Sequence, residues 1–316
     1  MFNWGFQWAL QGAGTPNQAG IGAFLPIAVG ENSVWFIDAL ANANFADFDG
    51  YSSIINTEVA GTTISTSTRL GYRWLNGDRS WMYGINAGYD SRPMNTGNAD
   101  AFIQDAKSVS DRRDVFFQQV AAGLEAVSDS WNFNAYGLFP IGDTEQSLNS
   151  HYRGGALSTY GLDVGYSITP QWNASIGYYY QHGDDLTEDD GSGIKGRLAY
   201  NISNGLTLGA NLSYDEAFDT RVSADLKVRF GGASTTAQRK EEVQQLPVIN
   251  ALTSTPSNRD VRVHDKEEVV CLYSKDVYGL WTCLLYGVVT TGQSLNSENP
   301  WNPCNERGFL FLQSPP

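Results

Sequence analysis

Residues 221–230 alternate strictly between apolar and polar side chains. Val222 and Leu226 belong to the apolar set, whereas Asp225 and Arg229 belong to the polar set. Successive side chains of a β-strand point to opposite faces, so this segment predicts a strand with one apolar and one polar face. In a soluble sheet the apolar face would cover a core. In an outer-membrane barrel it would meet lipid, and the polar face would line a wet lumen.

Further segments repeat this alternation, and their length separates the two alternatives. They are close to the roughly 9–11 residues that a tilted strand needs to cross a bilayer, whereas strands of globular proteins average about 5–6 residues. The predicted strands are residues 2–12, 20–28, 33–45, 64–75, 80–90, 115–127, 131–140, 158–168, 172–182, 193–202, 206–215 and 221–230.

Aromatic residues stand at both ends of several apolar faces. Trp172 and Tyr180 flank one predicted strand, and Trp81 and Tyr89 flank another. Aromatic rings favour the interfacial girdles of a bilayer, where one part of the ring is dry and another is wet. This placement favours the membrane alternative, because a soluble sheet has no reason to put aromatic residues at both ends of each apolar face.

The connections between the predicted strands alternate in length. Residues 76–79 and 203–205 carry Asn-Gly turn signals, whereas residues 91–114 and 141–157 are predicted to be long loops. Short turns on one rim and long loops on the other are typical of bacterial barrels. We therefore predict an all-β fold, a twelve-stranded antiparallel transmembrane β-barrel over residues 1–230. The sequence does not determine the structure of the C-terminal tail.

Composition agrees with this prediction and excludes one class of partner. Of 316 residues, 17% are charged and 13% are aromatic, where average soluble domains have roughly a quarter charged. Mean hydropathy is −0.31, and the sequence has no apolar run of the roughly 20 residues that a spanning helix needs. The net charge of −14 and the lack of a basic stripe argue against nucleic-acid binding.

The tail differs from the strands in character. We interpret residues 231–268 as a linker or a pore-threading segment, and residues 269–316 as the start of a short passenger, a small domain or a disordered tail. The tail contains all three cysteines, Cys271, Cys283 and Cys304, whose spacing matches no metal site and leaves their pairing open.

Several strand motifs resemble one family of barrels. They are YGINAGYD at 83–90, GLEA at 123–126 followed by WNFNAYGLFP at 131–140, YGLDVG at 160–165, YYYQHGD at 178–184 and LTLGA at 206–210. In order and spacing these motifs resemble the β-domain of the intimin/invasin family, the inverse autotransporters. The resemblance implies a twelve-stranded outer-membrane barrel whose chain re-enters the pore after the last strand and carries a C-terminal segment to the cell surface.

This resemblance also sets the expected location and partners. The partners would be outer-membrane lipid, the barrel-assembly machinery and the protein's own C-terminal segment in the pore, with the surface partner left open. We expect a location in the bacterial outer membrane. Residues 1–30 show no basic start or apolar core of a signal peptide, so export would depend on a leader not visible here.

Charged and amide residues opposite the apolar faces are the candidate functional residues. In a barrel they would line the lumen, where they could bound a channel, bind a threaded segment or merely neutralise one another. The predicted pore-lining residues are Asp38, Asn42, Arg69, Arg73, Asn86, Asp90, Glu125, Asn134, Asp163, Lys195, Arg197, Asp225, Lys227 and Arg229.

We predict no enzyme, no cofactor and no metal site. The three histidines, His151, His182 and His264, have no serine, cysteine or acidic partner at a spacing that suggests a catalytic triad. The acidic run at 184–190 matches no EF-hand and is interpreted as a solvated loop. The predicted function is anchoring and translocation of the C-terminal segment. The alternatives are a porin-like channel for small solutes and a soluble β-sandwich binding module.

Overall fold

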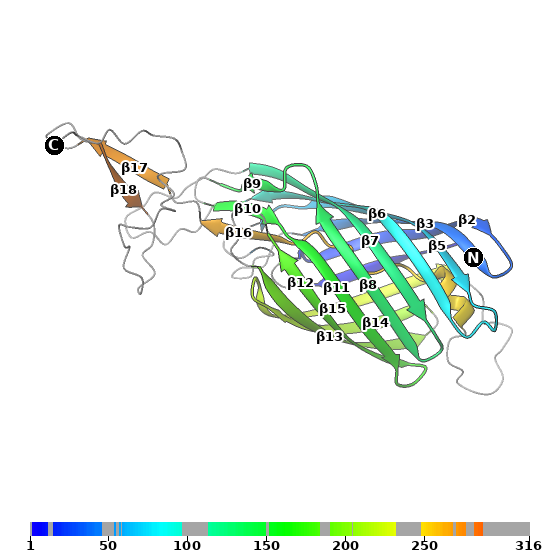
Figure 1. Ribbon diagram of the computed structural model, residues 1–316. Coiled ribbons are helices and arrows are strands. Elements are labelled where there is room, and N and C mark those ends of the chain that lie inside the picture. Colours follow the sequence, from blue (N-terminus) through cyan, green and yellow to red (C-terminus); the bar gives the residue numbers. More distant parts are fainter. Residues whose placement is uncertain are drawn as a thin grey trace.

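The computed structural model describes residues 2–11, 15–45, 54, 57, 59–96, 113–149, 152–183, 190–203, 205–231, 248–267, 270–275 and 281–286. Within these residues the chain forms a closed antiparallel β-barrel (Figure 1). Of the thirteen strands in the main sheet, β4 (Val59–Ala60) has two residues, and the other twelve form the ring. The predicted all-β, twelve-stranded barrel is therefore confirmed.

The twelve strands of the ring follow one another around the barrel in chain order. The first and last strands close the ring, pairing from Asn3 opposite Gly231 to Leu10 opposite Ala224. The strands are β1 (Asn3–Leu10), β2 (Gln18–Val29), β3 (Ser33–Asn44), β5 (Thr63–Leu75), β6 (Met82–Thr96), β7 (Arg113–Val127), β8 (Trp131–Pro140), β11 (Ser158–Ser167), β12 (Trp172–His182), β13 (Gly191–Ser203), β14 (Leu206–Asp215) and β15 (Asp219–Gly231).

The apolar face of each strand points away from the lumen. Ile176 and Val222 keep 73% and 70% of their side-chain surface exposed, whereas Asp225 and Arg73 on the inner face are buried. A soluble protein rarely exposes apolar surface on this scale, so the outer face is suited to lipid. The alternative of a soluble β-sandwich is wrong, because the sheet closes on itself around a polar interior. Among the described residues, no helix is long and apolar enough to span a membrane.

An aromatic belt marks the rim at which the short turns lie, here called the turn end. Neighbouring strands place rings against each other, for example Trp35 on Tyr72 at 4.8 Å and Trp131 on Tyr166 at 4.8 Å between centroids. Rings that lie between these pairs on the outer face continue the belt: Trp74, Trp81, Tyr83 and Phe133. Such a belt fits the boundary between hydrocarbon and headgroups.

The turn between β5 and β6 shows how short connections are fixed. The backbone N–H of Asn76 donates to Trp81 O at 2.9 Å, and the Trp81 N–H donates back to Asn76 Oδ1 at 2.9 Å. Within the turn, Ser80 donates to Asp78 Oδ1 through its hydroxyl at 2.8 Å and its N–H at 3.2 Å. These hydrogen bonds lower the pKa of the Asp78 carboxyl.

The opposite rim, the loop end, is more regular than the sequence suggested. Strands β6 and β7 run on together to Thr96 and Arg113, so the predicted loop at 91–114 is wrong for its first six residues and its last two. The predicted loop at 141–157 contains β9 (Glu145–Ser147) and β10 (Tyr152–Ala156), which form a small sheet with β16 (Val263–Glu267).

The C-terminal tail has two described parts. Residues 248–267 contain a short 3₁₀ helix, η2 (Val248–Thr253), and end in β16. Strands β17 (Val270–Lys275) and β18 (Trp281–Tyr286) form an antiparallel hairpin. Its register sets Cys271 opposite Leu285 and Cys283 opposite Tyr273; Cys304 lies outside the described residues.

Candidate functional site

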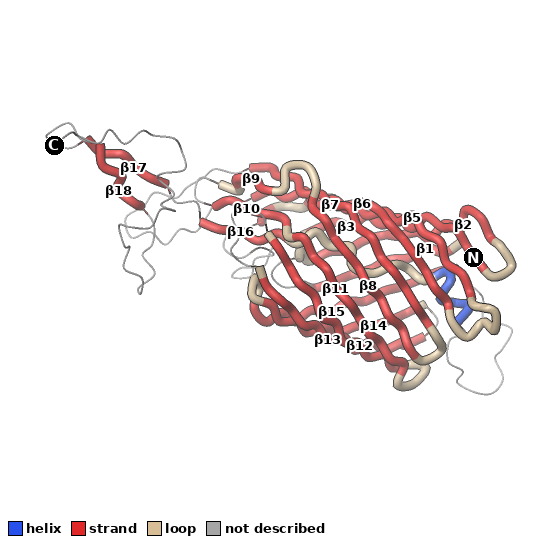
Figure 2. Tube along the Cα trace, viewed as in Figure 1, coloured by secondary structure: helices blue, strands red, loops and turns tan. Residues whose placement is uncertain are grey.

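Residues 248–267, here called the threaded segment, lie inside the barrel and run from the turn end to the loop end. Helix η2 occupies the turn end, where Figure 2 shows it in blue. Residues 254–262 have no helix or strand, and β16 reaches the loop end. The segment follows β15, whose last residues lie at the turn end. The chain therefore turns back into its own barrel and leaves it on the opposite side.

Helix η2 packs against the barrel wall at the turn end through apolar contacts. Val248 and Leu252 are 5% and 4% exposed and pack against Val34, Leu75 and Met82 of the wall. Burying these side chains stabilises the helix by roughly 1.5–3 kcal/mol each.

Several backbone carbonyls of residues 253–261 accept hydrogen bonds from wall side chains. Arg73 Nη1 donates to Ser254 O at 2.5 Å, and Arg229 Nη2 donates to Thr253 O at 2.6 Å. Farther along, Arg92 Nη1 donates to Val261 O at 2.9 Å. Similar but longer bonds run from Arg69 to Asn258 O, from Gln119 to Asp260 O and from Asn3 to Thr253 O. A segment in the lumen with no strand partner would otherwise bury unpaired carbonyls. These side chains therefore supply hydrogen bonds that a neighbouring strand would give in a sheet.

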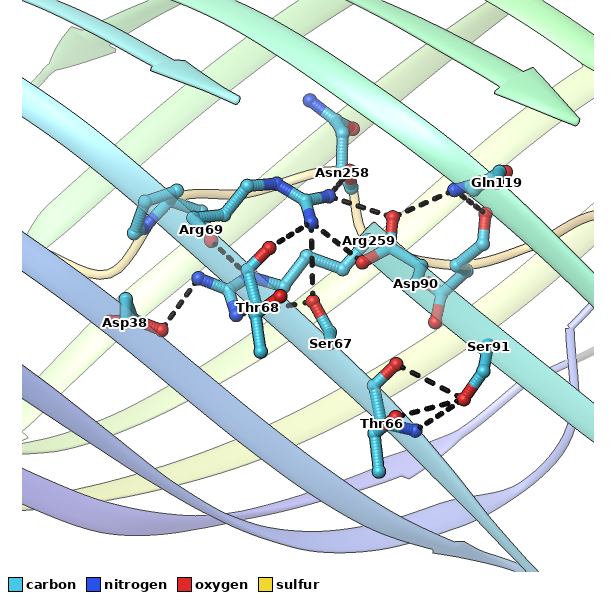
Figure 3. A network of polar contacts seen from close by, with 12 residues as sticks. Asp38, Thr66, Ser67, Thr68, Arg69, Asp90, Ser91, Gln119, Asn258 and Arg259 are labelled. Carbon is cyan, nitrogen blue, oxygen red and sulfur yellow. Dashed lines mark hydrogen bonds and ion pairs between the residues drawn. The ribbon is translucent and has the colours of Figure 1, made fainter. Parts of the chain in front are cut away.

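Two of the wall arginines, Arg69 and Arg73, are themselves held by carboxylates. Arg69 forms two parallel bonds with Asp90, at 2.7 and 2.8 Å, and both side chains are almost fully buried. Figure 3 shows Gln119 donating to the same carboxylate at 2.9 Å. Arg73 is held in the same two-bond way by Glu125, at 2.7 and 3.0 Å. Paired bonds of this kind fix the guanidinium plane, so each arginine is oriented before the segment contacts it.

One ion pair joins the segment directly to the wall. Arg259 Nη2 lies 2.6 Å from Asp38 Oδ1, with the two side chains 8% and 2% exposed. Arg259 Nη1 also donates to the Ser67 hydroxyl at 3.3 Å (Figure 3). Removing one partner of a buried pair costs about 3–5 kcal/mol, because the other charge stays buried alone. Arg259 therefore provides a strong side-chain attachment of residues 254–262 to the wall.

Neighbouring segment residues make polar contacts with the opposite wall. Asn258 accepts from Lys195 Nζ at 2.9 Å and donates to Asp163 Oδ2 at 3.1 Å, while Lys195 and Asp163 pair at 3.0 Å. Asn134 donates to the Ser257 hydroxyl at 3.0 Å. The segment is thus held from both sides of the lumen.

At the loop end the segment is held by an apolar cluster and by strand pairing. Val261 and Val263 of the segment pack with Phe117, Met94 and other buried residues, which are Ile54, Val59, Val115, Leu148 and Ala156. Strand β16 pairs with β10 from Val263 opposite Ala156 to Glu267 opposite Tyr152. Where the segment leaves the barrel it is therefore packed among side chains and fixed in register by backbone hydrogen bonds.

The predicted pore-lining residues divide into three groups in the structure. The first group contacts the segment: Asp38, Arg69, Arg73, Asn134, Asp163, Lys195 and Arg229. The second group orients other wall residues: Asp90, Glu125, Arg197, Asp225 and Asn42, the last accepting from Gln7 at 3.0 Å. The third group holds Lys227, which faces a cavity, and Asn86, which lies beside Gly123 on the inner face.

Sequence reasoning missed several residues of this site. Arg92 fell within a predicted loop, although the alternation of Asp90, Arg92 and Met94 continues that of the strand. Tyr179 was assigned to no site, yet its hydroxyl donates to Asp215 at 2.5 Å and its ring lies 4.5 Å from the Arg262 guanidinium. Only the fold reveals that these residues share the lumen with the threaded segment.

The histidines form no catalytic cluster within the described part of the chain. His182 Nδ1 lies 2.6 Å from Asp190 at the loop end, and the His264 ring lies 5.4 Å from that of Phe218. His151 and the acidic residues at 184–189 lie outside the described residues. Among the residues described, no group of three or more His, Cys, Asp or Glu side chains could hold a metal ion.

A cavity of about 500 Å³ remains in the lumen beside the threaded segment. Strands β1, β2, β3, β8 and β11–β15 line it on the wall side, with β1 and β15 contributing the most residues, and residues 255–260 and 262 form the other side. The segment therefore fills part of the lumen and leaves the rest to solvent.

No protein-family model and no curated protein matches this chain. Among solved structures, a chain from work on the in-meso crystallization of membrane proteins superposes with a TM-score of 0.58 at 12% identity, covering 84% of this chain and 100% of that one. The chain has the fold of outer-membrane β-barrel proteins. NanC porin matches with a TM-score of 0.41 at 9% identity, over 72% of this chain and 100% of the porin. An outer-membrane channel from Pseudomonas putida F1 matches with 0.39 at 13%, over 72% and 94%. At these identities the likeness concerns the fold alone.

Proposed function

We propose that this barrel is of the inverse autotransporter type, which anchors its own C-terminal segment in the outer membrane and presents the following residues at the cell surface. The observation that carries the proposal is the path of residues 248–267 through the lumen. Because the long loops of such barrels face outward, a chain that leaves at the loop end continues outside the cell.

The contacts of the segment support an anchoring role. Wall arginines bind its backbone carbonyls, Arg259 pairs with Asp38, and β16 adds to the sheet at the exit. The strand motifs that resemble the intimin/invasin β-domain support the same proposal independently. The partners that it requires are outer-membrane lipid around the barrel and the barrel-assembly machinery for insertion.

The native cysteines allow a direct test. All three, Cys271, Cys283 and Cys304, follow the threaded segment, so a membrane-impermeant maleimide applied to reduced, intact cells should label the wild-type protein. The matched control is a cysteine-free variant carrying Gly77→Cys in an exposed short turn, where an added side chain meets open space. This control should be labelled only after the outer membrane is permeabilised. Protection of the native cysteines on intact cells, with labelling after permeabilisation, would contradict the proposal.

A channel for small solutes is the second candidate function. The specific observation in its favour is the cavity of about 500 Å³ that the segment leaves open along β1 and β13–β15. Unitary currents through the full chain in planar lipid bilayers would support it. A folded, inserted protein that carries no current would exclude it.

A further inference from the structure

The residues that line the cavity beside the threaded segment range from the turn end to the loop end of the barrel. Asn3 and Thr255 line it at the turn end, whereas Thr15 and Arg262 line it at the loop end. Its walls carry both amide and charged side chains, so water can fill it. The cavity, here called the path, therefore lies alongside the segment as a space that water can occupy.

Most charged groups along this path are paired. Arg259 pairs with Asp38 and Lys195 with Asp163. The Asp225 carboxylate is held by Arg197. Arg221 forms a further pair with Asp215. These pairs add no net charge to the lining.

Lys227 differs from these groups, because the nearest carboxylate, that of Asp225, is already paired with Arg197. Its Nζ lies 4.0 Å from Asp225 Oδ1, and that same oxygen accepts from Arg197 Nη2 at 2.9 Å. The Lys227 side chain lies on the inner face, yet it keeps 56% of its surface exposed. Because Lys227 lines the cavity, this exposed surface faces the cavity, where water and small ions could reach it.

Two further cations line the path and form no ion pair within 4 Å among the residues described. Arg229 donates to Asn3 Oδ1 and to Thr253 O, which are neutral acceptors. The Arg262 guanidinium lies over the Tyr179 ring, and its Nη1 is buried without a hydrogen-bond acceptor. Against these three cations stands Asp260, whose side chain accepts from neutral Gln18 at 3.3 Å. The path thus has a positive excess inside a protein whose net charge is −14.

We propose that the path beside the threaded segment conducts small inorganic anions, such as chloride, in preference to cations. Rings of arginine and lysine select anions in pores, and narrow low-dielectric walls strengthen the field of each unpaired charge. The inference rests on the second proposed function, the channel, and is independent of whether the tail reaches the cell surface. Lys227 is its main determinant, since it is the most exposed of the three cations.

Planar bilayers with a potassium chloride gradient test this inference. The full chain, shown to be folded by heat-modifiable migration in gels, should give unitary currents whose reversal potential lies towards that of chloride. Lys227→Glu should lower the chloride-to-potassium permeability ratio several-fold, and Lys227→Gln should lower it by less. The control Arg79→Glu makes the same charge change in an exposed turn outside the cavity and should leave the ratio unchanged.

Each contrary result has its own meaning. Folded protein without current would remove the channel and the inference together. Current with a cation preference in the wild-type protein, or a permeability ratio that Lys227→Glu leaves unchanged, would leave the channel standing and overturn the anion selectivity. Neither result would bear on maleimide labelling of the tail.

Discussion

Lys195 and Asp163 form an ion pair of 3.0 Å although their strands, β13 and β11, are not neighbours. The strand between them, β12, contributes Gly177, which is in register with both residues. Strands two apart in a sheet are separated by roughly 10 Å, so their side chains meet only over a position without a side chain. A Cβ on Gly177 would lie 2.1 Å from Asp163 Oδ1 and 2.8 Å from Lys195 Cε.

Gly177→Ala should therefore break this pair and its contact with Asn258. We expect the free energy of unfolding to fall by about 1–3 kcal/mol, the cost of leaving buried polar groups unpaired. The measurement is urea unfolding in lipid vesicles. The matched control is Gly196→Ala on the outer face, where an added Cβ has nothing within 4 Å. Equal midpoints for the two variants would show that the pair contributes nothing to stability.

Reversing the charge at Arg259 should weaken the attachment of residues 254–262 to the barrel wall. Arg259→Asp places a second carboxylate against Asp38, so amide hydrogen exchange in residues 254–262 should become faster. The double variant Asp38→Arg/Arg259→Asp should restore much of the protection, because close pairs are coupled in double-mutant cycles.

A surface pair provides the control for this charge reversal. Arg153 and Glu145 lie 3.7 Å apart, with Arg153 38% exposed, and exposed pairs contribute only about 0–1 kcal/mol. Arg153→Asp should therefore leave exchange in the segment unchanged. If the Asp38/Arg259 double variant exchanges as fast as Arg259→Asp alone, the segment is not held by this pair.

The packing of η2 against the wall at the turn end should depend on Val248 but not on the next residue, Ile249. Val248 is 5% exposed, whereas Ile249 is 47% exposed. Val248→Asp would bury a charge without a partner, so η2 should leave the lumen and become sensitive to protease added on the turn side. Ile249→Asp should remain resistant. The same cleavage rate in both variants would mean that the helix is not packed against the wall.

The facing of the strands can be tested at two consecutive residues. Ile176 is 73% exposed on the outer face, whereas Ser175 lines the cavity. An arginine facing lipid costs about 2–4 kcal/mol near the bilayer midplane, so Ile176→Arg should lower folding yield into vesicles. Ser175→Arg should fold better, because its new charge meets water. The reverse order of yields would contradict the assignment of lipid to the apolar face.

The strands could be predicted from sequence because lipid on one face and water on the other impose alternation at every step. Where that constraint weakens, at the loop end, the prediction also weakened. Strand β6 continues through Pro93 to Thr96, and a proline within a run argues against a strand. The short strands β9 and β10 carry no such two-sided pattern, since they belong to the small sheet at the loop end and not to the barrel wall.

The candidate site was harder to predict than the fold. Alternation gives the face of Arg73 or Lys195, but it does not give the partner, which depends on strands brought together by closure. Residues 254–262 of the threaded segment form no helix or strand, and several of their backbone carbonyls accept hydrogen bonds from wall side chains. Its path therefore follows from the folded barrel and not from any local pattern in residues 248–267.

The pairing of β16 with β10 has a mechanical consequence for anything attached to the tail. Five residue pairs join the two strands, and β16 runs along the barrel axis towards the exit (Figure 1). A force pulling outward on the chain after Glu267 would load these hydrogen bonds together in shear, not one at a time. Any slip would then be resisted by Arg259 and, nearer the turn end, by the bulk of η2, so tension on the tail would be borne by the barrel itself.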